Sequence, residues 1–524
     1  MQSWPGAGAG AQRTKIALQL KEYATVNQAF RPPTLTLHAV DALDWSPRFG
    51  SLPSHFYSRV NPSALPDPYL VAFNPDAAPL LGLDPAAATS HEFVDSFTGN
   101  RLPRGANPLA AVYSGHQFGS YVPRLGDGRA ISLGEVVGRD GICDIQLKGA
   151  GLTPYSRMGD GRAVLRSSIR EYLCSEAMHA LGVPTTRALA ITGSDQPVIR
   201  ETVETAAVLT RLAPSFVRFG SFEYWYHRRD GAAVRTLADF VIHEFFPEFD
   251  GLADRHARFL AEVVRRTANM VAAWQTCGFM HGVMNTDNMS ILGLTLDYGP
   301  FGFMEAFDPG HICNHSDDAG RYAYNMQPRV AHWNLYALGQ ALVPLMEPEA
   351  IEAGLKGFDA AFDTALNAGL RRKLGLLAER DEDIALCDEM FALLAESRMD
   401  FTSFFRNLAP LESAGTGGDR VLRDHSLNPA RFDAWALRYR ARLCAEDSVD
   451  AQRRVAMNAV NPKYVLRNYL AEAAIRKAAD QRDYSEIARL HDVLRRPFDE
   501  QPQYEAYAAP APDWAAGLEV SCSS

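Results

Sequence analysis

Strand-like runs of apolar residues gather between about residues 110 and 215 of this chain, and helical spacing of apolar residues dominates its later part. Residues 130–136 and 143–148 are two largely apolar runs joined by a glycine-containing turn, a pattern that predicts a hairpin. Apolar residues then recur at helical spacing through residues 164–181, and Gly182 and Pro184 give the stop signal. One amphipathic helix is therefore expected after the hairpin.

A second set of elements follows this helix. A long helix is predicted from about Asp254, with its apolar residues on one face, and Gly278 marks its end. After Trp333 nearly every segment has helical spacing. Short strands are expected at residues 188–191, 198–202, 207–212, 290–292 and 295–296.

The order of these elements divides the chain into four parts. It runs from strands to one helix, more strands and then helices, which is the order of a two-lobed protein kinase. The expected fold class is therefore α+β, with a β-rich N-terminal lobe, a helical C-terminal lobe and an extension at each end. The parts are an irregular Pro- and Gly-rich extension (1–105), the first lobe (106–225), the second lobe (226–410) and a helical region with a Cys-containing tail (411–524).

Composition and charge narrow the possible functions. Of the 524 residues, 47% are hydrophobic and 22% are charged, which is typical of a globular protein and excludes a disordered chain. The 62 acidic and 52 basic side chains give a net charge of −10, so a general basic surface for nucleic acid is not expected. No run approaches the roughly 18–20 apolar residues that span a bilayer, and the first residues do not resemble a signal peptide. We therefore expect a cytoplasmic protein with no membrane or nucleic-acid partner.

The seven cysteines do not form a recognisable disulfide or metal pattern. They are scattered without a Cys-x-x-Cys motif, which argues against a disulfide scaffold and against a thiolate zinc site. A zinc site made of His311, Cys313 and His315 is a distant alternative, because ligands at two-residue spacing give poor tetrahedral geometry. Cys522 lies in a C-terminal tail that we expect to be mobile and exposed.

Two glycine-rich turns are candidates for contact with phosphate. Gly126, Gly128 and Arg129 precede the first strand of the expected hairpin. Asp160 and Gly161 precede the expected helix. Glycines let the backbone approach phosphate oxygens and present N–H groups to them, and helix N-termini favour anions. Either turn alone is more often an ordinary hairpin turn, but two such turns flanking one hairpin favour a phosphate site.

Four charged residues in the same region are candidates for holding a nucleotide. Lys148 ends a strand, as the phosphate-binding lysine of a kinase does, and Glu171 follows it by 23 residues in the helix where kinases place the partner of that lysine. A solvated strand end is the alternative for Lys148. Arg211 and Arg218 follow the upper strands and could grip a triphosphate bidentately if they line the cleft, with surface salt bridges as the alternative.

The segment from His281 to Asn288 is similar to a kinase catalytic loop with one substitution. These two residues have the register of His-Arg-Asp-x-x-x-x-Asn, but Val283 stands in place of the catalytic aspartate and cannot accept a proton. Asp287 is the nearest carboxylate that could accept one. Asp297 begins the sequence Asp-Tyr-Gly, where a kinase holds Mg²⁺ with Asp-Phe-Gly. The chemistry expected is kinase-like, with its base relocated.

Several longer runs together resemble one known family. The runs are residues 112–119, 146–157, 281–289 with 297–302, 313–317 and 522–524. They resemble the selenoprotein O (YdiU) family, and the resemblance extends from about residue 40 to the end of the chain. Members of that family look like kinases but act as protein adenylyltransferases, which bind ATP in an inverted orientation and transfer AMP to Ser, Thr or Tyr hydroxyls. UMP transfer, from UTP, is also attributed to bacterial members.

The resemblance implies a role for each candidate residue. Asp287 would be the proton acceptor, and Asn288 and Asp297 would hold Mg²⁺ or Mn²⁺. Glu171 would be the partner of Lys148. The implied nucleotide contacts are Gly126, Gly128, Arg129, Lys148, Asp160, Gly161, Arg211 and Arg218. The last two would neutralise the terminal phosphates and leave the α-phosphorus facing the acceptor hydroxyl, so that pyrophosphate is the leaving group.

The resemblance also implies redox regulation. Cys522 stands where some family members carry selenocysteine, and Cys313 lies in the segment that corresponds to an activation loop. A disulfide between them would restrict the loop, so that oxidation could gate activity. Two unrelated free thiols are the alternative.

Two other functions stay open. A conventional protein kinase could use the same lysine, metal ligands and glycine-rich turns to transfer phosphate instead of AMP. A catalytically inactive nucleotide-binding scaffold is suggested by Val283. Either transfer reaction takes a nucleoside triphosphate and protein substrates as its partners.

Overall fold

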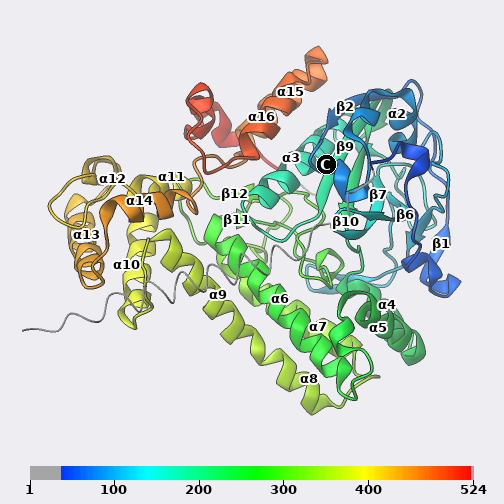
Figure 1. The fold of residues 1–524 in the computed structure, drawn as a ribbon, viewed down its shortest axis with the longest axis horizontal. Coiled ribbons are helices and arrows are strands. Elements are labelled where there is room, and N and C mark those ends of the chain that lie inside the picture. The colour runs from blue at the N-terminus through cyan, green and yellow to red at the C-terminus, as the bar shows by residue number, and fades with distance from the viewer. Residues whose placement is uncertain (1–36, 521–524) are drawn as a thin grey trace, which may run out of the picture.

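The computed structural model describes residues 37–520, and an eight-stranded sheet forms the right-hand part of Figure 1. The strand order is β1-β3-β6-β7-β10-β9-β2, with β8 beside β10, and every pairing between these strands is antiparallel. The strands are β1 (Tyr57–Arg59), β2 (Tyr69–Phe73), β3 (Leu109–Ala111), β6 (Ala130–Gly138), β7 (Gly141–Lys148), β8 (Ala163–Val164), β9 (Arg187–Ile199) and β10 (Val203–Ala213). Two small hairpins are separate from it, β4 (Gly115–Gln117) with β5 (Ser120–Val122) and β11 (Phe279–Met280) with β12 (Gly302–Phe303).

The predicted hairpin is confirmed as β6 and β7. Gly138 pairs with Gly141 at its turn, where Gly141 has a φ of 110° that favours glycine. At the other end Ala130 pairs with Lys148. This register brings the glycine-rich turn before β6 and the lysine at the end of β7 to the same end of these two central strands.

One long strand replaces two of the predicted strands. Residues 188–191 and 198–202 are predicted as separate strands, but β9 is continuous and ends at Ile199, and Thr202 lies between β9 and β10. The polar residues between the two runs resemble a loop in sequence, yet they stay extended because β10 pairs with them. The strand predicted at 207–212 is confirmed within β10.

The predicted amphipathic helix is confirmed as α3 (Leu165–Ala180). Its apolar residues are buried, and one side of the helix packs on β9 and β10. The C-terminal helices α15 (Asn468–Gln481) and α16 (Ser485–Leu494) pack against α3 as well, as Figure 1 shows. The position of Glu171 on α3 is therefore held from two sides.

The long predicted helix is confirmed as α6 (Arg255–Cys277), with Asp254 at its N-cap and Gly278 in the left-handed conformation at its end. It packs with α7, α8 and α9 in the lower part of Figure 1. The remaining helices are α2 (His91–Thr98), α4 (Phe219–His227), α5 (Gly231–Phe245), α7 (Gln327–Ala341), α8 (Pro348–Leu355), α9 (Gly357–Lys373), α10 (Glu382–Ser397), α11 (Phe401–Leu408), α12 (Asp419–His425), α13 (Pro429–Cys444) and α14 (Asp450–Asn458). Among residues 37–520, none of the helices combines the length and apolar character needed to cross a membrane.

Two predictions of local structure are wrong. The extension predicted to be irregular supplies β1 and β2, which form the two edges of the sheet, and α2, which packs on β9 and β10. The sequence does not reveal these strands because the strands they pair with lie far along the chain. Strands are predicted at 290–292 and 295–296, but Ser290 and Thr295 make only isolated bridges. The domain boundaries themselves stay a prediction.

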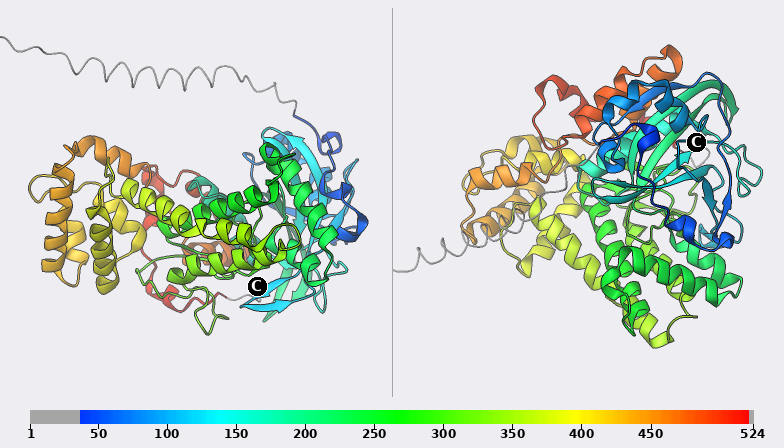
Figure 2. Two further views of the ribbon diagram at one scale, coloured as in Figure 1. Left: turned by 90° about the horizontal axis from the view of Figure 1, so that it is seen from below. Right: turned by 45° about the vertical axis from the view of Figure 1, so that its right-hand side comes forward.

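Three groups of buried apolar residues hold these elements together. One lies between the helices and one face of the sheet and includes Trp274 of α6. Another lies on the opposite face and includes Phe93 and Phe97 of α2. A third, around Trp435, joins α10–α13, which lie at the far end from the sheet in Figure 2. The sheet around the end of β7, where Lys148 lies, is thus packed against apolar residues on both faces.

Candidate functional site

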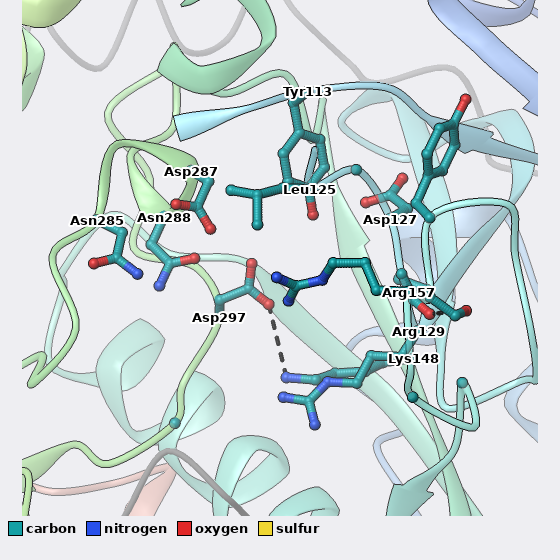
Figure 3. Close-up of a pocket in the computed structure, with 18 of the residues that line it drawn as sticks. Tyr113, Leu125, Asp127, Arg129, Lys148, Arg157, Asn285, Asp287, Asn288 and Asp297 are labelled. Carbon is teal, nitrogen blue, oxygen red and sulfur yellow. Dashed lines mark hydrogen bonds and ion pairs between the residues drawn. The ribbon is translucent and has the colours of Figure 1, made fainter. Parts of the chain in front are cut away.

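A cavity of about 760 Å³ opens between the Lys148 end of the β6–β7 hairpin and the loop that joins β11 to β12. Figure 3 shows Asp287, Asn288 and Asp297 on one side of the pocket and Arg129 and Lys148 across from them. The predicted residues that line it are Gly126, Gly128, Arg129, Lys148, Asp160, Gly161, Arg211, Arg218, Asp287, Asn288 and Asp297. The fold therefore gathers candidates from distant segments into one pocket.

The glycines of the two turns are required by close packing of the backbone. At Gly126, where φ is 82°, a Cβ atom would lie 2.5 Å from the ring of Tyr155. At Gly128 it would lie 2.8 Å from the carbonyl oxygen of Tyr155. At Gly161 it would overlap the carbonyl oxygen of Gly151. Both turns thus pack against the segment between them, and their contact with phosphate stays a prediction.

Lys148, which lines the pocket, forms a buried ion pair with Glu171 behind it. The Nζ atom of Lys148 lies 2.5 Å from Oε2 of Glu171 and 3.7 Å from Oδ1 of Asp297. Burial lowers the pKa of Lys148, and the charge of Glu171 opposes this effect. A solvated strand end is therefore excluded for Lys148, and Glu171 fixes its position without itself lining the pocket.

Arg211 and Arg218 are also buried, with 3% and 2% of their surface exposed, so they are not surface salt bridges. Nη1 of Arg211 lies 2.5 Å from Oδ1 of Asp297 and 3.1 Å from Oε1 of Glu171. Nη1 of Arg218 donates to Oδ2 of Asp297 at 2.9 Å and to the backbone carbonyl oxygen of Asp287 at 2.8 Å. Both guanidinium groups therefore converge on one carboxylate.

Asp297 is held as an anion by these cations. Burial raises the pKa of its carboxyl group, but the charges of Arg211, Arg218 and Lys148 outweigh burial and hold the pKa well below its usual range. The backbone of Asp297 has a φ of 58°, in the left-handed region that is uncommon outside glycine.

Asp287 has the opposite electrostatic surroundings. Burial raises the pKa of its carboxyl group to about 7, and the charge of Arg218 opposes this effect without overcoming it. Its Oδ2 atom accepts a hydrogen bond from Nε2 of Gln117 at 3.3 Å. Its Oδ1 atom is buried and has no hydrogen-bond partner within residues 37–520. This oxygen is available to accept a proton from a bound hydroxyl group.

Asn288 and Asp297 supply oxygen ligands suited to Mg²⁺ or Mn²⁺. The Nδ2 atom of Asn288 donates to the carbonyl oxygen of Val283 at 3.0 Å, which leaves its Oδ1 atom free to face the pocket. Figure 3 shows this side chain next to the carboxylate of Asp297. Hard divalent cations prefer carboxylate and carbonyl oxygens, so the donor set fits such an ion.

Several pocket residues are missed by motif reasoning. Arg218 lies over the ring of Tyr113, with its Cζ atom 4.5 Å from the ring centroid. Asp127 is buried, and burial raises the pKa of its carboxyl group. Gln117 contacts Asp287, and Arg157 adds a further cation to the lining. Tyr113, Gln117 and Arg157 lie in runs that carry the family resemblance, whereas Asp127 lies in the first glycine-rich turn, where the motif gives it no role in the site.

Two further predicted residues lie at or beside the pocket, since Asp160 lines it and Cys313 contacts a residue that does. Asp160 forms an ion pair with Arg200, with contacts of 2.8 and 2.9 Å. The Sγ atom of Cys313 donates to the carbonyl oxygen of Pro300 at 3.0 Å, and Pro300 lines the pocket. Cys522 lies outside the described residues.

The distant zinc alternative is not supported within the part of the chain that the structure describes. His311, Cys313 and His315 do not form a group whose ligand atoms lie close enough to hold an ion. The side chain of His315 instead lies 3.5 Å from the carboxylate of Glu519.

This chain is similar to named proteins over nearly its whole length. Residues 39–495 match the family described as Protein adenylyltransferase SelO. A protein of Thiobacillus denitrificans named Protein nucleotidyltransferase YdiU is 58% identical over 486 residues, which cover 93% of this chain and 99% of that protein. Proteins of the same name from Cupriavidus pinatubonensis (59% over 493 residues, 91% of this chain and 95% of the relative) and Herminiimonas arsenicoxydans (56% over 495 residues, 93% and 99%) are also similar.

Proposed function

This chain belongs to the SelO family of protein adenylyltransferases, and we propose that it transfers AMP from ATP to a Ser, Thr or Tyr hydroxyl of a protein, with UMP from UTP as a second possible group. One observation carries the proposal for this pocket. Among the described residues that line the pocket, basic side chains outnumber acidic ones by seven to four: Arg129, Lys148, Arg157, Arg162, Arg200, Arg211 and Arg218 against Asp127, Asp160, Asp287 and Asp297. The excess positive charge favours a polyanionic ligand such as a triphosphate.

We propose that the nucleotide lies with its terminal phosphates toward Arg211 and Arg218. Both guanidinium groups are buried and charged at any physiological pH, so they can neutralise the β- and γ-phosphates. The α-phosphorus then faces the acceptor hydroxyl. When bound at Asn288 and Asp297, Mg²⁺ or Mn²⁺ supplies further positive charge for the phosphate oxygens. The glycine-rich turns and Arg129 complete the phosphate contacts in this proposal.

Asp287 is the proposed proton acceptor. The hydroxyl oxygen of the protein substrate attacks the α-phosphorus, and the hydroxyl proton moves to Oδ1 of Asp287. The bond between the α-phosphorus and its bridging oxygen to the β-phosphorus breaks, and pyrophosphate leaves. Val283, at the position of the kinase aspartate, also lines the pocket, but an aliphatic side chain takes no part in proton transfer.

We propose that the surrounding fold is two-lobed and kinase-like. The sheet strands β3 and β6–β10 with α3 would form the lobe of residues 106–225, to which the extension adds the edge strands β1 and β2, and the helices from α5 to α11 would form the lobe of residues 226–410. The location of the pocket between the Lys148 end of the β6–β7 hairpin and the loop after β11 supports this division. The regions 1–105 and 411–524 would then be extensions of a nucleotide-binding body.

The transferred group tests the proposal directly. Full-length protein is incubated with a candidate protein substrate, Mg²⁺ and ATP, and the intact mass of each protein is measured. AMP transfer adds about 329 Da, whereas phosphate adds about 80 Da. ATP labelled on the α-phosphate marks the product in the first case, and ATP labelled on the γ-phosphate marks it in the second.

Two results would contradict the proposal. A gain of phosphate alone would identify a conventional kinase. Absence of any transfer with ATP or UTP and either metal, to the protein itself or to a proteome extract, would favour an inactive scaffold. Asp363→Asn, at an exposed carboxylate of α9, is the matched control for variants of the pocket aspartates.

We propose that Cys313 and Cys522 form a regulatory disulfide. The backbone N–H of His315 donates to the carbonyl oxygen of Val520 at 2.9 Å, which joins a residue two positions after Cys313 to one two positions before Cys522. Mass mapping of the oxidised, non-reduced protein tests this. Absence of a cross-linked peptide containing both cysteines would remove the proposal without affecting the proposed transfer reaction.

A further inference from the structure

A second cluster of side chains suited to a metal lies away from the oxygen ligands of the pocket, where β4 meets α4. Glu223 and His227 are four residues apart on α4 and therefore lie on one face of the helix. Nδ1 of His116, in β4, lies 2.5 Å from Oε2 of Glu223. Ligand atoms of all three residues lie within 4.8 Å of one another.

A glycine brings β4 and α4 together. A Cβ atom at Gly220 would overlap the carbonyl oxygen of Ser114, and the N–H of Ser114 donates to the carbonyl oxygen of Gly220 at 3.1 Å. Because no side chain separates the two backbones, the strand that follows Ser114 runs directly along α4. His116 can therefore reach Glu223.

Glu223 has an oxygen atom without a partner. The side chain is 1% exposed, and its Oε2 atom contacts His116. Its Oε1 atom is buried and makes no hydrogen bond to any described residue. A buried carboxylate oxygen without a partner is destabilising, and a bound cation would satisfy it. His227 is exposed, so an ion can reach the cluster from solvent.

We propose that His116, Glu223 and His227 bind a divalent transition metal, with Zn²⁺ as the favoured ion. Two imidazole nitrogens and one carboxylate form a ligand set that Zn²⁺ uses together with a water molecule. A tetrahedral site places ligand atoms about 3.3 Å apart, so His116 and Glu223, now a hydrogen-bonded pair at 2.5 Å, would separate slightly to admit the ion in place of their shared proton. His227 would close the remaining gap by rotation of its exposed side chain. The nitrogen ligands distinguish this site from Asn288 and Asp297, whose oxygens suit Mg²⁺.

The site would connect metal binding to the loop that carries Asp287. The backbone N–H of His116 donates to Oγ1 of Thr286 at 2.7 Å, and the next residue, Gln117, donates to Oδ2 of Asp287. A metal fixed between β4 and α4 holds this donor in place. Its effect on the pocket is thus one of positioning, and metal binding does not depend on the proposed transfer reaction.

Zinc stoichiometry in matched variants tests the site. Full-length wild type, His227→Ala, Glu223→Gln and the control His243→Ala are titrated with Zn²⁺ in excess Mg²⁺, and free Zn²⁺ is measured with a chromophoric chelator. His243 is an exposed histidine beside a carboxylate, Asp250, which makes it a matched control. Wild type and His243→Ala are expected to bind one equivalent more than the other two variants, with the same cysteines present in all four proteins.

A spectroscopic readout accompanies the titration. Co²⁺ in place of Zn²⁺ is expected to give the visible absorption bands of a four-coordinate site in wild type and in His243→Ala, and to lose them in His227→Ala. Equal Zn²⁺ stoichiometry and equal Co²⁺ spectra in wild type and His227→Ala would overturn the proposal. Circular dichroism without metal checks folding, and His227→Ala decides alone if Glu223→Gln does not fold, because His227 is exposed.

Discussion

The Asp297 side and the Asp287 side of the pocket place the same kind of side chain in opposite environments. The carboxylate of Asp297 contacts Lys148, Arg211 and Arg218. The carboxylate of Asp287, ten residues earlier, contacts the neutral amide of Gln117, while Arg218 donates to its backbone carbonyl oxygen. Cations therefore decide the pKa of one group, and burial decides the pKa of the other.

The contrast shows how one pocket can provide a fixed anion and a proton acceptor. A carboxylate held by guanidinium groups stays ionised and is suited to orient cations. A carboxylate whose pKa is near 7 exchanges its proton under physiological conditions and is suited to general base catalysis. Variants of each aspartate should separate these roles.

The largest expected effect is the loss of transfer in Asp287→Asn. An amide of the same shape cannot accept a proton, so the rate of AMP transfer is expected to fall by about 10²–10⁴-fold. Label incorporated from α-labelled ATP measures this rate. Asp363→Asn should transfer AMP at the wild-type rate.

Nucleotide affinity separates the two explanations for such a loss. Asp287→Asn should bind ATP with nearly unchanged affinity in isothermal titration calorimetry, because Asp287 is not one of the residues proposed to contact the nucleotide. A loss of ATP affinity as large as the loss of rate would assign Asp287 to binding and end its role as base.

The next largest effect is the loss of stability in Asp297→Asn. This change leaves Arg218 without its carboxylate and Arg211 with Glu171 alone, and breaking a buried pair costs about 3–5 kcal/mol. Asparagine tolerates the φ of 58° at this position, so the backbone adds little to the effect. Urea denaturation measures the free energy of unfolding, and a value equal to that of wild type would show that water screens these pairs.

The pH dependence of unfolding should differ between the two sides. In the folded protein Asp287 binds its proton up to a pKa of about 7, whereas its ordinary pKa is 3.8, so its burial destabilises the fold as pH rises between these values. In metal-free buffer Asp287→Asn should match wild type near pH 4 and exceed its stability near pH 8 by at most about 4 kcal/mol.

Asp297→Asn should show the opposite trend. The pKa of Asp297 is lowered, so its stabilising effect is present above the ordinary carboxyl pKa and is lost as pH falls through the folded-state value. The deficit of Asp297→Asn relative to wild type should thus be largest near neutral pH and shrink in acid. Parallel pH profiles for the two variants would contradict the contrast between the aspartates.

The smallest expected effect is that of Arg211→Lys. Lysine keeps the charge but cannot reproduce the fork that joins Arg211 to Asp297 through Nη1 and to Gln146 through Nη2 at 2.6 Å. ATP affinity, measured by calorimetry, is expected to fall about tenfold, which corresponds to about 1.4 kcal/mol. Arg420→Lys, at a side chain that is 93% exposed, is the control, and equal affinities in both variants would exclude bidentate recognition by Arg211.

Local patterns in the sequence predict the elements that local interactions determine. The hairpin β6–β7 and the helices α3 and α6 are predicted correctly because their periodicity and glycine stops lie within each segment. The edge strands β1 and β2 and the continuity of β9 are not, because strands are completed by partners far along the chain.

The candidate site divides in the same way. Motif spacing predicts Lys148 and Glu171 as a pair, and the structure places them in contact. It does not predict that Arg211 and Arg218 both reach Asp297, nor that Gln117 is the donor to Asp287. These contacts join separate segments and have no local pattern.

The sequence by itself determined which chemical groups are present and the order in which they occur, including the valine that excludes a proton acceptor at position 283. Only the tertiary structure decided how each group behaves. The donor to Asp287 is 170 residues away in the chain, and the cations around Asp297 come from β7, β10 and the residue before α4. A pKa depends on burial and on charges within a few ångströms, and both are set by segments that meet only after folding.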